Sequence, residues 1–295
     1  MCCDGTVINT ALPAGQDVAT LREVAERLAA EAAEFVRTRR AEVFLTAPVA
    51  DAVAAKSDPT DPVTIVDTET EALLRARLAE LRPGDPILGE EGGGPAQVAE
   101  PGAVTWVLDP IDGTVNFVYG IPAYAVSVAA QVDGVSVAGA VAHVSAGEIY
   151  SAATGLGAHV TGRGGTAALR CSDVSELGMA LVGTGFDYSA RRRTEQARLL
   201  AALLPTVRDI RRIGSAALDL CLVAAGRLDA HYEHELHAWD WAAGALIAAE
   251  AGATVLVPEP GAGTGTGLVV ASAPGVAEAL RAELARLGAF ELLAE

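Results

Sequence analysis

The pattern of apolar residues changes near residue 172 of this chain. Before that point, two segments with apolar residues at helical spacing, 17–40 and 68–81, accompany several short apolar runs of strand length. These runs lie at 63–66, 87–88, 104–108, 125–132, 135–141 and 148–151. After residue 172, strand-length runs alternate with helical segments, which is typical of an α/β sheet with some parallel strands. We therefore predict a flexible tail at 1–16, an α+β domain at 17–172 and an α/β domain at 173–295.

Local signals refine this outline. Thr68, with Glu71 three residues later, fits a capping box at the start of the second helix. Asp133-Gly134 predicts a two-residue hairpin turn. The Pro- and Asp-rich segment 48–62 and the Gly-rich segment 259–267 are predicted to be loops. Residues 154–166 are rich in small side chains and are assigned to no strand.

The net charge of the chain restricts its partners. There are 21 Lys and Arg residues against 38 Asp and Glu, which gives −17, whereas surfaces that bind nucleic acid are basic. We therefore expect no nucleic-acid partner, and an anionic substrate only if cations bridge it to the protein. The most apolar stretch, 241–257, contains Glu250 and is too short to span a membrane, so no membrane partner is expected.

The four cysteines indicate a reducing environment. Cys2, Cys3, Cys171 and Cys221 show no metal-binding or disulfide spacing, and no apolar signal segment follows the first two. The sequence therefore predicts a cytoplasmic protein in which Cys171 and Cys221 pack in the core. The basic run at 191–193 is expected to be a solvated or interfacial cluster, with a dimer contact or a substrate entrance as the alternative.

An apolar run ends abruptly in two carboxylates, Asp109 and Asp112, with a proline between them. Two carboxylates at the end of a buried strand repel each other unless cations lie between them, and such hard oxygen ligands suit Mg²⁺ or Mn²⁺. The proline has no N–H and can leave the Ile111 carbonyl turned towards a metal. Gly113 and Thr114 supply backbone N–H groups at a helix start, where an oxyanion binds well. A strand end with solvated Asp residues is the alternative.

Further carboxylates follow other predicted elements. Glu90 and Glu91 come after a short strand, Asp240 lies at a helix start between two tryptophans, and Asp67 directly follows the strand at 63–66. Each has an ordinary structural interpretation as well. The two Glu residues can form a solvated loop, and Asp240 or Asp67 can simply cap a helix.

Three motifs, taken in order, resemble the inositol monophosphatase family: Gly89-Glu-Glu91, Asp109-Pro-Ile-Asp-Gly-Thr-x-Asn-Phe117 and Trp239-Asp240. Segment 214–230 fits the C-terminal pattern of the same family, and the similarity runs from about residue 17 to residue 290. The chain looks most like the mycobacterial and actinobacterial branch. The resemblance implies a layered α-β-α-β-α fold, in which the N-terminal domain binds metal and the C-terminal domain completes the active site.

The resemblance also implies hydrolysis of phosphate monoesters with two or three Mg²⁺ ions, for which Mn²⁺ can substitute. Glu90, Asp109 and the Ile111 carbonyl would hold the first ion, and Asp109, Asp112 and Asp240 the second. Glu90 would also reach a weaker third ion through water.

The reaction implied by the resemblance is an in-line attack of a metal-activated water on phosphorus. Its catalytic residues would be Asp67, Thr114 and Glu90. Glu233 matches a carboxylate that accepts hydrogen bonds from ring hydroxyls, with a solvated loop acid as the alternative. The residues expected to contact the substrate are Asp112, Gly113, Thr114, Ser215, Glu233 and Asp240.

The preferred substrate is inositol 1-phosphate, a phosphorylated polyol. A related monoesterase acting on histidinol phosphate, fructose 1,6-bisphosphate or a 3′-phosphoadenosine nucleotide is the second hypothesis. The third is a regulatory protein-docking module that keeps the phosphatase fold, although a pure scaffold has no need for four clustered acids. The resemblance further implies a homodimer and inhibition by lithium.

Overall fold

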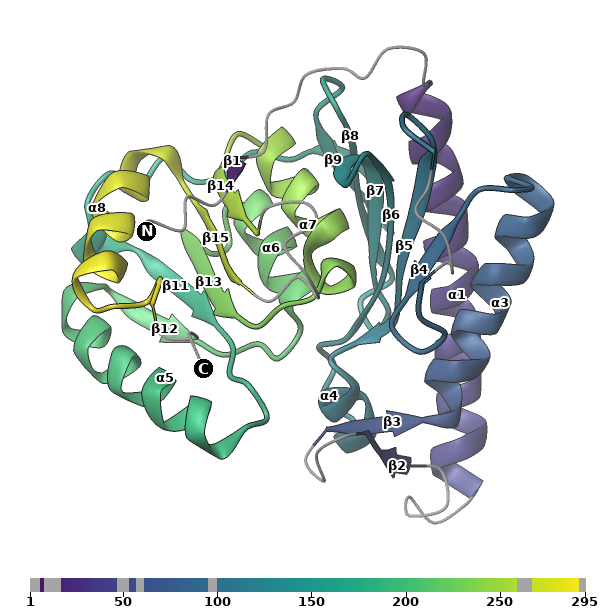
Figure 1. Ribbon diagram of the computed structural model, residues 1–295, viewed down its shortest axis with the longest axis horizontal. Helices are drawn as coiled ribbons and strands as arrows, with labels where there is room; N and C mark the ends of the chain where they lie inside the picture. Colours follow the sequence, from purple (N-terminus) through teal and green to yellow (C-terminus); the bar gives the residue numbers. More distant parts are fainter. Residues whose placement is uncertain are drawn as a thin grey trace.

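The elements of the computed structural model stack as five layers, in the order helix, sheet, helix, sheet, helix (Figure 1). The structure describes residues 6–7, 17–46, 53–56, 61–94, 100–258 and 267–291. Layers of this kind bury one face of each outer helix and both faces of each sheet. The predicted α-β-α-β-α arrangement is confirmed.

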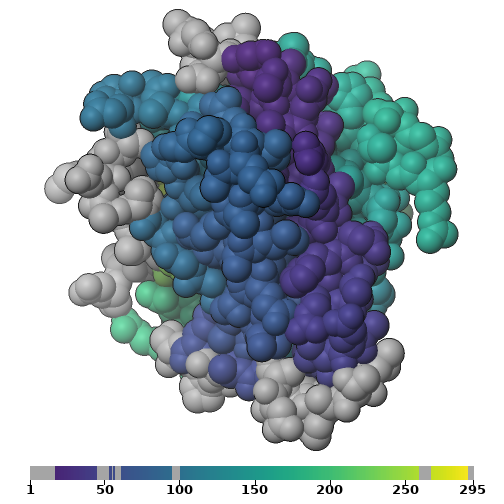
Figure 2. All heavy atoms as spheres, turned by 90° about the vertical axis from the view of Figure 1, so that its right-hand side faces the viewer, coloured from purple at the N-terminus to yellow at the C-terminus, as the bar shows by residue number. Residues whose placement is uncertain are grey.

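The larger sheet runs in the order β10-β9-β8-β7-β6-β5-β4. Its strands are β4 (Ile87–Gly89), β5 (Val104–Asp112), β6 (Ala125–Val132), β7 (Val135–His143), β8 (Glu148–Ala153), β9 (Ala158–Gly162) and β10 (Gly165–Ala168). Helices α1 (Val18–Thr46) and α3 (Ile65–Leu81) cover its outer face, where they lie side by side (Figure 2). Arg39 and Arg77 link the two helices through ion pairs to Glu69 and Glu31 at 2.7 and 2.9 Å.

The middle layer consists of α6 (Ala216–Ala224) and α7 (Ala238–Glu250), which lie between the two sheets (Figure 1). Small residues bring these helices close to their neighbours. A Cβ atom on Gly139 of β7 would lie 3.0 Å from the Ala243 backbone of α7, and one on Gly244 would lie 2.8 Å from Leu220 of α6. This close packing fixes where the first turn of α7 lies relative to the larger sheet.

The second sheet runs in the order β1-β14-β15-β13-β11-β12, and β11 pairs in parallel with both β12 and β13. Its strands are β1 (Thr6–Val7), β11 (Leu181–Thr184), β12 (Asp209–Arg211), β13 (Ala230–His234), β14 (Thr254–Val257) and β15 (Leu268–Ser272). Helices α5 (Ala190–Leu203) and α8 (Pro274–Arg286) lie on the outer side (Figure 1). The predicted partly parallel sheet of the C-terminal half is confirmed.

The remaining described elements are short. They are β2 (Val53–Ala55), β3 (Pro62–Thr64), α4 (Thr114–Tyr119) and two 3₁₀ turns at Leu177–Met179 and Leu204–Thr206. Among the described residues, no helix combines the length and apolar character that crossing a bilayer requires. Cys171 and Cys221 are buried free thiols, as predicted, whereas Cys2 and Cys3 lie outside the described residues.

Several local predictions were wrong. Helix α3 begins at Ile65 with Thr64 as its N-cap and Asp67 as the capping-box acid, so Thr68 and Glu71 do not form the predicted box. The reason is that the strand at 63–66 ends two residues earlier than the apolar pattern suggests. Strand β5 continues through Asp109 to Asp112 instead of ending at residue 108.

Short strands also occupy segments to which the sequence analysis assigned no strand. Strand β2 pairs with β3 inside the segment predicted as a loop, and β9 and β10 form a hairpin in the region of small residues. Thr6–Val7, in the predicted tail, pairs with β14. The other residues of the tail, and residues 48–52, 57–60 and 259–266 of the predicted loops, lie outside the described residues. The domain boundary near residue 172 stays a prediction.

Candidate active site

A β-bulge turns Asp109 and Asp112 to the same side of the larger sheet. Asp109 pairs with Ser127 and Asp112 pairs with Ala125, so β5 has one more residue than β6 between these two pairs. Without the extra residue, side chains three positions apart would point to opposite faces of a strand. Pro110 lies in the bulge, a position at which no N–H is needed for a hydrogen bond between the strands.

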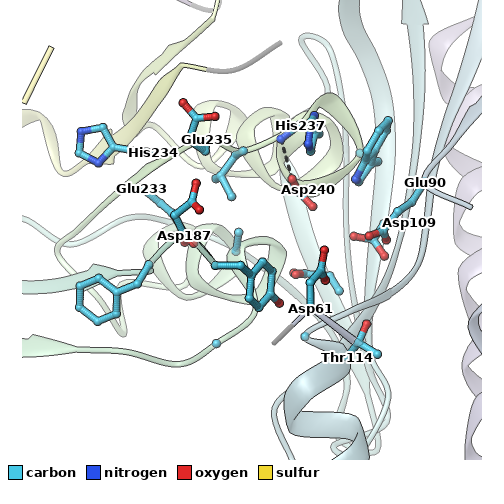
Figure 3. A pocket seen from close by; sticks show the side chains of 18 of the residues that line it. Asp61, Glu90, Asp109, Thr114, Asp187, Glu233, His234, Glu235, His237 and Asp240 are labelled. Atoms are coloured by element: carbon cyan, nitrogen blue, oxygen red, sulfur yellow. Dashed lines mark hydrogen bonds between the residues drawn. The ribbon is translucent and has the colours of Figure 1, made fainter. Parts of the chain in front are cut away.

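Two other elements bring carboxylates to the same place. Glu90 follows β4, whose parallel pairing of Gly89 with Leu108 sets Glu90 beside Asp109. Asp240 lies in the first turn of α7, where its Oδ2 accepts the His237 N–H at 2.6 Å. Ligand oxygens of Asp109, Asp112 and Asp240 lie within 4.8 Å of one another. Figure 3 shows the Glu90, Asp109 and Asp240 side chains turned towards one space. We call Glu90, Asp109, Asp112 and Asp240 the carboxylate cluster.

The electrostatics of the carboxylate cluster favour a bound cation. Burial raises the pKa of Asp112 to about 6 and raises the pKa values of Glu90, Asp109 and Asp240 above their usual range, and the mutual repulsion of the carboxylates adds to this. Asp109 Oδ1 is buried and has no hydrogen-bond partner among the described residues. The negative charge of these oxygen ligands is not balanced by nearby positive charge, so the residues of the cluster fit a divalent cation.

Lys56 supplies part of the missing positive charge. Its Nζ lies 2.6 Å from Glu90 Oε1 and 2.8 Å from Glu91 Oε1. Lys56 therefore links its own segment to the two acidic residues that follow β4.

Glu71 holds the loop that carries Glu90. This buried carboxylate accepts the backbone N–H groups of Glu91 and Gly92, both at 2.8 Å, and pairs with Arg75 at 2.7 Å. Sequence reasoning missed this role and assigned Glu71 to a helix cap. The only signal in the sequence was an acidic residue on the buried side of an amphipathic helix.

Asp67 caps α3 and also contacts Thr114. Its Oδ2 accepts the Thr64 N–H at 2.9 Å and the Thr64 hydroxyl, which caps α3. Its Oδ1 lies 3.1 Å from Thr114 Oγ1, which is also 2.9 Å from the Ile111 carbonyl oxygen. Burial raises the pKa of Asp67 to about 7. A buried carboxyl that titrates near neutrality beside a hydroxyl can take up a proton at physiological pH.

The predicted substrate contacts occupy different positions around the cavity. Glu233 lies on the opposite side of the cavity from the carboxylate cluster (Figure 3), and burial raises its pKa to about 8. Gly113 lines the cavity with φ +92° and packs so tightly that a Cβ atom would lie 2.9 Å from the Gly214 carbonyl oxygen. Ser215 is buried behind Asp112, to which its Oγ donates at 2.6 Å. Ser215 therefore positions Asp112 and does not itself line the cavity.

The carboxylate cluster lines one cavity of about 410 Å³ together with Lys56, Gly113, Thr114 and Glu233. Sequence reasoning missed several of its other lining residues, because nothing in their local pattern distinguishes them from solvated surface residues. They are Asp61, Phe186, Asp187, Tyr188, Arg212, Glu235 and Leu236. Arg192, from the basic run at 191–193, also lines the cavity and lies 3.1 Å from both Asp187 and Glu235.

The carboxylate cluster has two buried members, Asp109 and Asp112, and two half-buried ones, Glu90 and Asp240. Together with the Thr114 hydroxyl and the Asp67 carboxyl, whose pKa is about 7, these groups define a site of the cation-dependent hydrolase type. Comparison with known proteins specifies the class. Residues 17–289 match the inositol monophosphatase family, so the chain belongs to that family. It is therefore a phosphatase, and the family to which it belongs is metal-dependent.

Individual relatives agree with this assignment. An inositol-1-monophosphatase of Mycobacterium leprae is 71% identical over 276 residues, which covers 92% of this chain and 95% of that protein. The structure of Mycobacterium tuberculosis SuhB is similar with a TM-score of 0.80 at 62% identity and covers 94% of this chain and all of that one. A Nus factor SuhB of Vibrio cholerae is 38% identical over 72% of this chain and 79% of that protein.

Proposed function

We propose that this phosphatase hydrolyses inositol 1-phosphate to inositol and inorganic phosphate. The observation that carries the proposal is the placement of Glu233 across one cavity from the carboxylate cluster. A phosphate held at the cluster would direct the rest of a small substrate towards Glu233. The name of the Mycobacterium leprae relative supports the same substrate.

Mg²⁺ is the proposed cofactor, with two or three ions bound and Mn²⁺ as a substitute. Glu90, Asp109 and the Ile111 carbonyl would hold one ion, and Asp109, Asp112 and Asp240 a second. When bound, the ions would neutralise the phosphate, lower the pKa of a water molecule and stabilise the leaving oxygen. Two observations support this assignment: Asp109 Oδ1 has no hydrogen-bond partner in the described part of the chain, and the pKa of Asp109 is raised.

Asp67 and Thr114 would take up the proton that the attacking water loses. Thr114 Oγ1 contacts Asp67 Oδ1, so a water that donates to the hydroxyl can pass its proton to a carboxylate whose pKa is about 7. The Gly113 and Thr114 N–H groups lie at the start of α4, where they are available to phosphate oxygens. Glu233 would accept hydrogen bonds from ring hydroxyls and would thereby select a polyol.

Phosphate release from a panel of monoesters at a few mM Mg²⁺ tests the proposal. The panel contains inositol 1-phosphate, histidinol phosphate, fructose 1,6-bisphosphate and 3′-phosphoadenosine 5′-phosphate. We expect a preference of at least about tenfold in kcat/KM for inositol 1-phosphate, which is about 1.4 kcal/mol. Glu233→Gln should reduce that preference and leave the slower substrates little changed. Equal rates across the panel would overturn the substrate assignment and leave a broad monoesterase.

A regulatory docking role is the second candidate, and the relative named a Nus factor supports it. Because Arg192 lines the cavity, the docking test uses only its neighbours, Arg191→Glu and Arg193→Glu together. If docking is a separate function, the double variant should lose partner binding while kcat stays normal. A double variant that binds its partner normally would exclude this surface.

Three further properties belong to the same proposal. We propose a cytoplasmic homodimer that is inhibited by lithium. Sedimentation of the full chain at micromolar concentration should give the mass of two chains, and a sedimenting monomer would contradict the dimer. Phosphate release that stays constant at high LiCl would contradict lithium inhibition.

A further inference from the structure

A second group of potential ligands lies outside the carboxylate cluster. It consists of Asp219 on α6 and of His231 and Glu233 on β13, and we call it the buried triad. One ligand atom from each residue lies within 4.8 Å of the others. His231 and Glu233 are two positions apart on one strand, so their side chains leave the sheet on the same face. Asp219 faces them from the middle helix layer.

Two members of the buried triad, Asp219 and His231, have buried polar atoms without hydrogen-bond partners among the described residues. His231 is fully buried and Asp219 is 1% exposed. Both ring nitrogens of His231 and both carboxylate oxygens of Asp219 have no hydrogen-bond partner within the described part of the chain. His231 Nδ1 is 3.9 Å from Asp219 Oδ2, and His231 Nε2 is 3.6 Å from Glu233 Oε2, which is too long for hydrogen bonds. Buried polar groups left in this state require an ion or a bridging water.

The backbone opposite the triad leaves room for these side chains. A Cβ atom on Gly183 of β11 would lie 2.8 Å from Asp219 Oδ1 and 3.2 Å from His231 Nδ1. A Cβ atom on Gly185 would lie 1.8 Å from Glu233 Oε1. Two glycines at alternate positions therefore create the space that the triad occupies, and any larger residue would close it.

We propose that Asp219, His231 and Glu233 form a second metal site that binds a transition-metal ion such as Zn²⁺. One ligand atom from each of the three residues lies within 4.8 Å of the others, and ligand atoms that share an ion at about 2.1 Å lie about 3 to 4 Å apart, so the side chains would move closer together around the ion. Only one His231 nitrogen would bind the ion, together with one oxygen each of Asp219 and Glu233, because the two ring nitrogens point away from each other. An imidazole ligand favours Zn²⁺ over Mg²⁺, which prefers oxygen. The ion would fix the conformation of Glu233, which lines the cavity.

Zn²⁺ binding to the full chain in excess Mg²⁺ tests this proposal, with a chromophoric chelator as competitor. We expect one Zn²⁺ ion that Mg²⁺ does not displace. His231→Phe keeps a ring of similar size but removes both nitrogens, and its Zn²⁺ affinity should fall at least 100-fold. Asp112→Asn changes the carboxylate cluster alone and should keep the ion. This readout is independent of phosphatase activity, so it can fail without affecting the proposed function.

Several outcomes would overturn the proposal. Equal Zn²⁺ affinity in the wild type and His231→Phe would place the ion elsewhere, and its loss in Asp112→Asn would place it in the carboxylate cluster. No Zn²⁺ binding by the wild type would leave only a water-bridged network. If His231→Phe does not give a cooperative thermal unfolding transition, crystals of the wild type soaked in Zn²⁺ decide the matter. An anomalous peak about 2.0–2.2 Å from a His231 nitrogen is expected, and a peak only beside Asp109 and Asp240 would refute the site.

Discussion

Replacement of Asp112 by Asn separates the charge of this residue from its structural role. Ser215 Oγ–H and Ala217 N–H donate to Asp112 Oδ2 at 2.6 and 2.7 Å, and an Asn side-chain oxygen can accept both hydrogen bonds. The negative charge, however, is unfavourable in the metal-free fold, because burial raises the pKa of Asp112 from 3.8 to about 6. A tenfold change in proton affinity is worth about 1.4 kcal/mol, so this rise corresponds to about 3 kcal/mol above pH 7.

We expect Asp112→Asn to raise the free energy of unfolding by about 3 kcal/mol at pH 8 without metal, because the charge that opposes folding is gone. At the same time kcat should fall by roughly 10²- to 10³-fold or more, since a group that organises charge at the reacting centre is lost. Urea unfolding with and without a few mM Mg²⁺ measures the first effect, and phosphate release measures the second. Mg²⁺ should stabilise the wild type more than the variant.

Asp85→Asn is the matched control, because Asp85 accepts the Trp106 Nε1–H at 3.0 Å outside the cavity. It should neither stabilise the metal-free protein nor affect kcat. An Asp112→Asn variant with near-normal kcat would refute the place of Asp112 among the cation ligands. If the variant is less stable than the wild type in metal-free buffer, the electrostatic reasoning is wrong.

Three other predictions follow from the surroundings of the carboxylate cluster. Glu71→Ala should weaken Mg²⁺ activation by about 10- to 100-fold, because it removes the hydrogen bonds that hold the Glu90 loop. Glu71→Gln keeps one acceptor oxygen, so its activation should weaken less. A Mg²⁺ titration of phosphate release compares the two variants. Thr64→Val should cost about 1 kcal/mol through the lost N-cap and should shift the acid limb of the pH–rate profile upward, because the Thr64 hydrogen bonds lower the pKa of Asp67. In metal-free buffer, the free energy of unfolding measured with urea should fall between about pH 4 and pH 8. Folding raises the pKa values of Asp112, Asp67 and Glu233 to about 6, 7 and 8, so the folded state keeps these protons at a pH where the unfolded state has already lost them. A flat pH profile would contradict this.

Local patterns predicted most helices and strands and the separate acidic segments, whereas the layered fold and the complete ligand set were implied by the family resemblance. Apolar periodicity indicated most helices and strands, and each ligand of the cluster directly follows a recognisable apolar run or helix start. The bulge that turns Asp109 and Asp112 to one face could not be predicted, since the strand was expected to end before it. Glu71 was misassigned because its partners, the Glu91 and Gly92 N–H groups, lie 20 and 21 residues away.

The residues that line the cavity on the side of the second sheet could not be predicted for a different reason. Arg212 and Glu235 carry no motif, and they reach the cavity only because α6 and α7 hold the two sheets together. The residues of the buried triad likewise come together only through the packing of separate elements. Neither His231 nor Asp219 was given a role from the sequence, because they lie 12 residues apart and form no recognisable motif. Their meeting depends on the pairing of β13 with β11 opposite Gly183, a contact between segments nearly 50 residues apart.

Helix capping and site assembly depend on the same carboxylates in this fold. Asp67 accepts the Thr64 N–H with one oxygen and contacts Thr114 with the other. Asp240 accepts the His237 N–H with one oxygen while it faces Asp109 and Asp112. Because a capped carboxylate cannot rotate without breaking its backbone hydrogen bond, the start of each helix fixes the direction of a group in the cavity. The capping and catalytic interpretations of these two acids are therefore compatible, since the cap is what orients the group for chemistry.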